Sequence, residues 1–176
     1  MLVGILTATL LAMESVEAAK LRRLQIGEYG MLEVTTPDEW VSESGRDTAD
    51  PEMLLKAPGR EFVMRIVARP LPGVAGISAL ERIRAAVERM AAAPEVTENA
   101  ENPQPPIQEL RGPTASGYYF SMTDTKWTRA PGDYHYMTEG SMVVGTLAVG
   151  FRILSNAEAD REPALEVLRS ASQVTQ

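Results

Sequence analysis

The stretch MVVGTLAVGFRIL, Met142 to Leu154, decides the fold class. Apolar residues occupy both parities of this run, and Arg152 is its only charged residue. Successive side chains of a β-strand point to opposite faces of the sheet, so an apolar residue at nearly every position predicts a central strand covered on both faces. We therefore expect one long strand here, with other strands on either side and further elements packed above and below it.

The chain before this run alternates short apolar segments with turn residues. Ile107–Arg111, Ser116–Asp124 and Asp133–Glu139 are predicted strands separated by loops rich in Gly, Pro and Lys, which is typical of an antiparallel meander. A two-residue turn at Glu139-Gly140 or Gly140-Ser141 would join the last of them to the long strand. In the first half, REFVMRIVARP, Arg60 to Pro70, alternates most clearly between two faces.

Two segments have the periodicity of helices. ISALERIRAAVERMAAAP, Ile77 to Pro94, repeats apolar residues at helical spacing, and Ser78 and Glu81 form a predicted capping box. A closing helix is predicted after Asn156, which can cap its first turn. Between them, 95–106 is rich in Glu, Asn, Gln and Pro and is predicted to be an exposed, mobile loop. The order of elements predicts an α+β fold, a mainly antiparallel β-sheet covered by helices.

The length of 176 residues suits one domain, and the composition narrows its partners. Acidic residues outnumber basic ones by 24 to 17, which disfavours nucleic acid as a partner. There is no cysteine, so neither a disulfide framework nor a lipid-modified cysteine is available.

The N-terminus has the pattern of a signal peptide. LVGILTATLLAM, Leu2 to Met13, is mostly apolar and too short to cross a bilayer, and Val16-Glu17-Ala18 after it offers small or modest residues at the positions that a signal peptidase reads. We expect residues 1–19 to be removed on export and residues 20–176 to form a single periplasmic or secreted domain with no integral membrane segment. No Lys or Arg precedes the apolar run, so an amphipathic N-terminal helix of a cytoplasmic protein is the alternative.

His135 is the only histidine of the chain and lies within GDYHYMTEG, Gly132 to Gly140. A strand over this segment places His135 in the body of the strand on the same face as Met137 and Val144. One interpretation is a partly buried histidine satisfied by a single hydrogen bond. The other is a metal-assisted enzyme, because a hairpin would bring Asp124 and Asp133 close to His135, and two carboxylates with one imidazole suit zinc or manganese.

The loop between the two strands carries a second candidate site. Trp127 lies there beside Lys126 and Arg129, and an exposed Trp flanked by cations suits a protein partner or an anionic small molecule. The alternative is that Trp127 folds back and covers the edge of the sheet. Tyr118 and His135, on the adjoining strands, complete the set of candidate binding residues. No nucleophile motif accompanies them, and no cofactor motif is present.

Several of these segments together resemble a known family. TTPDEW, the hairpin from SGYYFSMTDTKW to GDYHYMTEG, the strand MVVGTLAVGFRIL and the helix PALEVLRSA are similar to small exported bacterial proteins of the PsbP-like group over roughly residues 25 to 173. The resemblance implies an α/β/α sandwich and an accessory or binding role. No active-site residue carries over from it. The resemblance and the missing nucleophile motif together lead us to expect a non-catalytic exported binding or accessory module. Its partner would be a protein or a small ligand.

Overall fold

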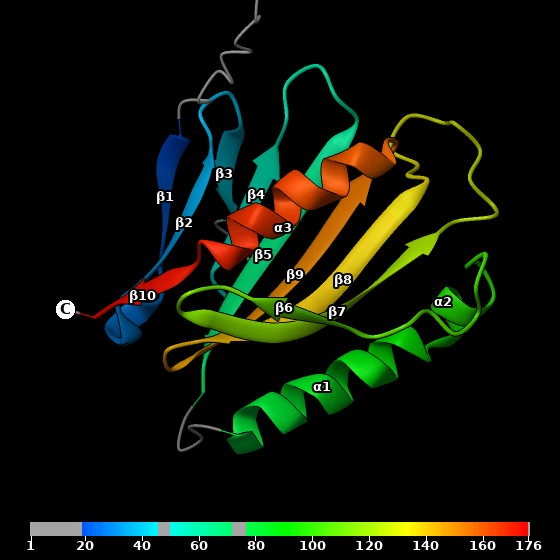
Figure 1. Cartoon of the computed structure of the whole chain (residues 1–176). Helices are drawn as coiled ribbons and strands as arrows, with labels where there is room; N and C mark the ends of the chain where they lie inside the picture. The colour runs from blue at the N-terminus through cyan, green and yellow to red at the C-terminus, as the bar shows by residue number, and fades with distance from the viewer. Residues whose placement is uncertain (1–18, 46–49, 72–76, 176) are drawn as a thin grey trace, which may run out of the picture.

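The computed structural model describes residues 19–45, 50–71 and 77–175. Within these residues the strands form two antiparallel sheets (Figure 1). The larger has the order β3-β4-β5-β9-β8-β7-β6 and the smaller β1-β2-β10. The strands of the larger sheet are β3 (Val41–Gly45), β4 (Glu52–Lys56), β5 (Phe62–Pro70), β6 (Gln108–Arg111), β7 (Ala115–Thr123), β8 (Tyr136–Val144) and β9 (Leu147–Ser155). Those of the smaller are β1 (Ala19–Gln25), β2 (Met31–Pro37) and β10 (Ser172–Val174).

Helices lie on both faces of the larger sheet (Figure 1). Helix α3 (Arg161–Arg169) lies across one face, here called the inner face, and α1 (Ile77–Ala91) runs along the other, the outer face. The short helices are η1 (Gly27–Tyr29), α2 (Pro94–Thr97) and η2 (Glu158–Asp160). The prediction of an α+β fold with an antiparallel sheet between helical layers is confirmed.

The apolar run that begins at Met142 is two strands, not the single strand predicted. The chain leaves β8 at Val144, turns at Gly145 and Thr146 and returns as β9, with Val144 opposite Leu147. Gly145 has φ +59°, in the left-handed region that glycine adopts without steric cost. The predicted turn at 139–141 is therefore wrong. Gly140 lies inside β8, between Tyr119 of β7 and Phe151 of β9.

The two faces of β9 are covered to different extents. Its inner side chains are buried against α3 and the smaller sheet, as in Val149 and Phe151. Its outer side chains are half-buried, except for Arg152, which is exposed. Helix α1 packs on β7 and β8, so the outer face of β5 and β9 is only partly covered. The expected cover on both faces is thus complete on one face only.

On the outer face of β5 and β9, charged side chains neutralise one another. Arg65 pairs with Glu52 at 2.6 Å and Arg152 pairs with Glu139 at 2.8 Å. Antiparallel sheets can leave one face in water when that face is polar.

The segment 95–106 is not the exposed loop that its composition suggested. It begins with α2, and Val96 and Ala100 are buried against α1 and Phe120. Backbone hydrogen bonds tie it to the end of β7, where the Glu101 amide donates to the Thr123 carbonyl at 3.0 Å. The segment has few apolar residues, but Val96 and Ala100 both pack into the cluster formed by α1 and Phe120, and this contact holds the segment against the sheet.

The predicted helix from Ile77 and the predicted signal peptide are only partly covered by the described residues. The predicted helix from Ile77 is α1, but the side chain of Ser78, and with it the capping box, lies outside the described residues. The predicted signal peptide also lies outside them, apart from Ala19, where β1 begins. None of the helices in the described part of the chain has the length and hydropathy needed to cross a membrane.

Candidate functional site

The segment 124–135, which connects β7 to β8, brings most of the predicted site residues together. We call it the 124–135 loop. Trp127 contacts both His135 and Arg129 there, and Lys126 precedes the tryptophan on an exposed part of the loop. Tyr118 does not belong to this group. It lies on the outer face in β7, where it packs beside α1 with the Arg84 guanidinium 5.6 Å from its ring centre.

The centre of the site is a stack of flat side chains. The rings of Trp127 and His135 lie 4.5 Å apart between centroids and are nearly parallel, at 13°. The Arg129 guanidinium carbon lies 5.2 Å from the centre of the Trp127 ring, within the range of a cation–π contact. The His135 ring also contacts the ring of the next residue, Tyr136, with the two ring centroids 4.4 Å apart and the ring planes tilted by 49°. Trp127 and His135 are both half-buried, so each keeps part of its ring in solvent.

His135 was predicted to lie in the body of a strand, and this prediction is wrong. Strand β8 begins one residue later, at Tyr136. The parity argument placed it on one face with Met137 and Val144. Because the hairpin turn lies at Gly145 and not near Gly140, Met137 and Val144 belong to the same strand and lie on opposite faces of it. At the end of the loop, the imidazole is free to stack on Trp127 instead of packing against apolar strand neighbours.

Two carboxylates shape the loop from within. The Asp133 carboxylate accepts hydrogen bonds from the backbone amide and from the hydroxyl of Thr128, both at 2.7 Å. These bonds from Thr128 favour the charged form and hold the pKa of Asp133 below its usual value of 3.8. Asp124 accepts from the Lys126 amide at 2.7 Å. Both carboxylates thus stabilise turns of the loop backbone, a common role of Asp in loops.

Asn156 fixes the loop to the rest of the molecule. Its side-chain oxygen accepts from the His135 amide at 2.8 Å, and its side-chain nitrogen donates to the Asp133 carbonyl at 3.2 Å and to the Glu61 carboxylate. The prediction that Asn156 caps the closing helix is wrong, since η2 has Ala157 at its N-cap position. The sequence carries no local signal for this role, because its partners are 21 and 95 residues away.

Arg129 has a strained backbone. Its φ is +63°, and among the described residues it is the one non-glycine residue with a positive φ. The left-handed conformation costs an arginine roughly 1 kcal/mol relative to glycine. Here it accompanies the placement of the guanidinium over the Trp127 ring.

The proposed metal ligands are not arranged as ligands. The Asp124 amide donates to the His135 carbonyl at 2.8 Å, so Asp124 rather than Asp133 lies opposite the histidine. Asp124 and Asp133 each accept hydrogen bonds from loop amides. Among the residues that the structure describes, no three His, Cys, Asp or Glu side chains gather closely enough to hold a metal ion.

Comparisons with known proteins give one named similarity of structure. No family model matches the chain, and no curated protein does. A search of solved structures finds similarity to the solution structure of cyanobacterial PsbP (CyanoP) from Synechocystis sp. PCC 6803. The match covers 94% of this chain and 99% of that chain, with 12% sequence identity and a TM-score of 0.48. The matched protein is of the PsbP group that the sequence segments also resemble.

Proposed function

We propose that this protein is a non-catalytic binding module whose 124–135 loop docks onto a protein partner. The observation that carries the proposal is the stack of Trp127 on His135 with the Arg129 guanidinium above the indole. Trp and Arg are the residue types that most often dominate the energy of protein interfaces. Here they lie next to each other on a loop and keep part of their surface in solvent.

The loop is held in shape before any partner arrives. The bonds of Asp133 to Thr128, and of Asn156 to the His135 amide, fix both ends of the stack. A surface ordered in advance loses less conformational entropy on binding, so more of the contact energy appears as affinity. The strained backbone of Arg129 agrees with a role of the loop in binding, since backbone strain in proteins concentrates at functional positions.

The charges of the loop indicate the chemistry of the partner. The carboxylates of Asp124 and Asp133 accept hydrogen bonds within the loop, whereas Lys126 and Arg129 are exposed. The complementary surface would offer an apolar recess for the Trp127 ring and carboxylates around it. An interface of this kind weakens as salt concentration rises, because rim charges are screened.

The loop chemistry also supports binding over catalysis. A metal-assisted reaction would need Asp124, Asp133 and His135 to point at one ion, and the two carboxylates instead hold amides of their own loop. Their local hydrogen bonds account for their presence without any reaction.

The proposal includes export. Cleavage after Ala19 would remove one residue of β1 and leave its pairs with β2 from Lys20 opposite Thr36 onward. N-terminal sequencing of the protein recovered from separated cell fractions tests this directly. A mature chain that starts at Lys20 in the periplasmic or secreted fraction agrees with export, and an intact Met1 in the cytoplasm contradicts it.

Site-specific photo-crosslinking tests the docking surface. A photoreactive amino acid is placed at Ala130, on the exposed loop, and in a second variant at Glu43, an exposed control position in β3. In cells that produce the protein naturally, position 130 should give a discrete crosslinked protein that position 43 does not give. Trp127→Ala should abolish that adduct. The same adduct at both positions, or one that survives in Trp127→Ala, argues against the loop as the docking surface.

A further inference from the structure

A second feature lies on the inner face of the larger sheet, beyond the residues covered by α3. In the register of β7, β8 and β9, the row of Tyr119, Gly140 and Phe151 is followed by two rows of different character. Five of the six positions in these two rows carry a hydroxyl group: Ser121, Thr138 and Ile153 in one row, Thr123, Tyr136 and Ser155 in the next. The inner face therefore changes from apolar to polar over two residues along each strand.

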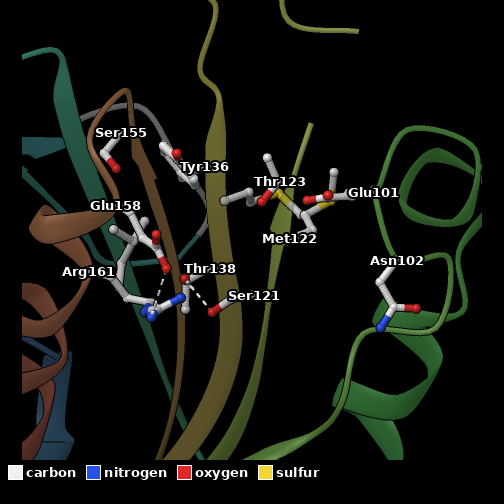
Figure 2. Close-up of a pocket in the computed structure, with 12 residues that line it drawn as sticks. Glu101, Asn102, Ser121, Met122, Thr123, Tyr136, Thr138, Ser155, Glu158 and Arg161 are labelled. Atoms are coloured by element: carbon white, nitrogen blue, oxygen red, sulfur yellow. Dashed lines mark hydrogen bonds and ion pairs between the residues drawn. The ribbon is translucent and has the colours of Figure 1, made fainter. Parts of the chain in front are cut away.

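A hollow lies over this hydroxyl patch (Figure 2). Arg161 and Glu158, from the start of α3 and from η2, form one wall, and Glu101 and Asn102, from the segment after α2, stand on the other side. The hollow has a volume of about 130 Å³. At roughly 10–15 Å³ per water this is room for on the order of ten water molecules, and so for a molecule of about ten non-hydrogen atoms.

The hydroxyls at the floor are buried and keep hydrogen-bonding capacity. Thr138 and Ser155 are both 3% exposed. The hydroxyls of Ser121 and Thr138 lie 2.7 Å apart, and Ser155 donates to the Ala157 carbonyl at 2.9 Å. Each hydroxyl has one donor and two acceptor sites, so these contacts use only part of what is present. Among the described residues no buried side-chain nitrogen or oxygen lacks a hydrogen-bond partner, so a ligand would use the remaining donor and acceptor capacity of these hydroxyls.

The charges around the hollow determine which polar ligand fits. Arg161 contributes one positive charge and contacts Glu158 at 3.4 Å, and Glu101 adds a second carboxylate. The walls are thus net negative, which disfavours phosphate or a carboxylic acid. A neutral polyol presents groups that both donate and accept, and it matches hydroxyls, a guanidinium and carboxylates equally. The Tyr136 ring and Ile153 provide apolar surface for its C–H groups.

We propose that this hollow binds a neutral polyhydroxylated small molecule of monosaccharide size. The site is distinct from the 124–135 loop, although the two adjoin, since Tyr136 lines the hollow and its ring contacts His135. Ligand binding here does not depend on the loop being a docking surface, and either proposal can fail without the other.

Amide NMR titration of the full chain tests the proposal. The probes are D-glucose, D-galactose, D-mannose and D-ribose, each to about 100 mM so that dissociation constants in the millimolar range are detected, with sodium phosphate and glycine as charged probes. At least one sugar should give saturable shifts confined to amides around Thr123, Thr138 and Arg161. Thr138→Val, which keeps the shape of the side chain, and Arg161→Gln should each weaken binding at least tenfold. Trp127→Ala should not change it.

Ser116→Ala is the matched control, because Ser116 lies in β7, the strand next to that of Thr138, and on the outer face. It should bind the sugar as the unaltered chain does. The proposal is overturned if no sugar gives saturable shifts, if phosphate or glycine binds more tightly than every sugar, or if Thr138→Val and Ser116→Ala behave alike while both remain folded.

Discussion

Replacement of Gly140 by alanine should destabilise the fold, while the same change at Gly150 in the neighbouring strand should not. A Cβ at Gly140 would lie 2.4 Å from the Tyr118 carbonyl oxygen and 2.6 Å from the Phe151 ring. The first neighbour is backbone of the adjacent strand and cannot move alone. At Gly150 a Cβ meets nothing within 4 Å, because it points to the partly open outer face.

The expected magnitudes follow from these contacts. Overpacking of a well-packed core costs about 1–3 kcal/mol, and each kcal/mol lowers the melting temperature of a chain of this length by roughly 2–4 °C. Gly140→Ala should therefore lower it by about 2–12 °C. Gly150→Ala should be neutral or stabilise by about 0.4–1 kcal/mol, since alanine loses less entropy on folding.

Urea unfolding followed by circular dichroism, together with a thermal scan, measures both variants against the unaltered chain. Equal stability of Gly140→Ala and the unaltered chain would refute the packing of Phe151 over Gly140. Equal destabilisation by both substitutions would refute the uncovered outer face of β9.

Further predictions concern the loop and the segment after α1. A double-mutant cycle of Trp127→Ala and His135→Ala should give a coupling energy of about 0.5–1.5 kcal/mol in urea unfolding, and additive effects would mean that the rings do not stack. Arg129→Gly should leave stability within about 0.5 kcal/mol, because relief of backbone strain offsets the lost cation–π contact; a loss above 2 kcal/mol would show that Arg129 is structural. The depressed pKa of Asp133 means that its stabilising effect is present above 3.8 and is lost as pH falls through the lower folded value. The Trp127 indole N–H signal in NMR should accordingly shift below pH 3.8 and not in Asp133→Asn, whereas a midpoint above 3.8 is incompatible with this cause. In hydrogen exchange the amides of Glu101 and Thr125, which donate to the carbonyls of Thr123 and Asn99, should be protected. Exchange at the rate of an unfolded chain would mean that the segment 95–106 is the exposed loop that its composition predicted.

The fold class was predictable because it depends on periodicity. The alternation in 60–70 and the helical spacing in 77–91 are local, and the structure contains both elements where they were expected. The turn between β8 and β9 was not predictable in the same way. Gly140 and Gly145 look alike in sequence, but one is needed for close packing against Phe151 and the other for a positive φ.

The composition of the site could be predicted, while its geometry could not. Trp127, Arg129 and His135 were singled out by residue type, and the structure brings them together. Their stacking depends on the position where β8 begins and on Asn156, a residue distant in sequence that holds the His135 amide. The hydroxyl patch was also missed, since Ser121, Thr138 and Ser155 become neighbours only through the strand register.

The most direct test of the central claim is the effect of Trp127→Ala on the affinity for the protein captured through position 130. An interface hot spot costs 2 kcal/mol or more on truncation, so the dissociation constant should rise about 30-fold or more. Tyr29→Ala, at an exposed aromatic residue outside the loop, is the matched control and should change it less than about twofold. A Trp127→Ala protein that is folded and binds as tightly as the unaltered chain would contradict the claim that this loop is the binding surface.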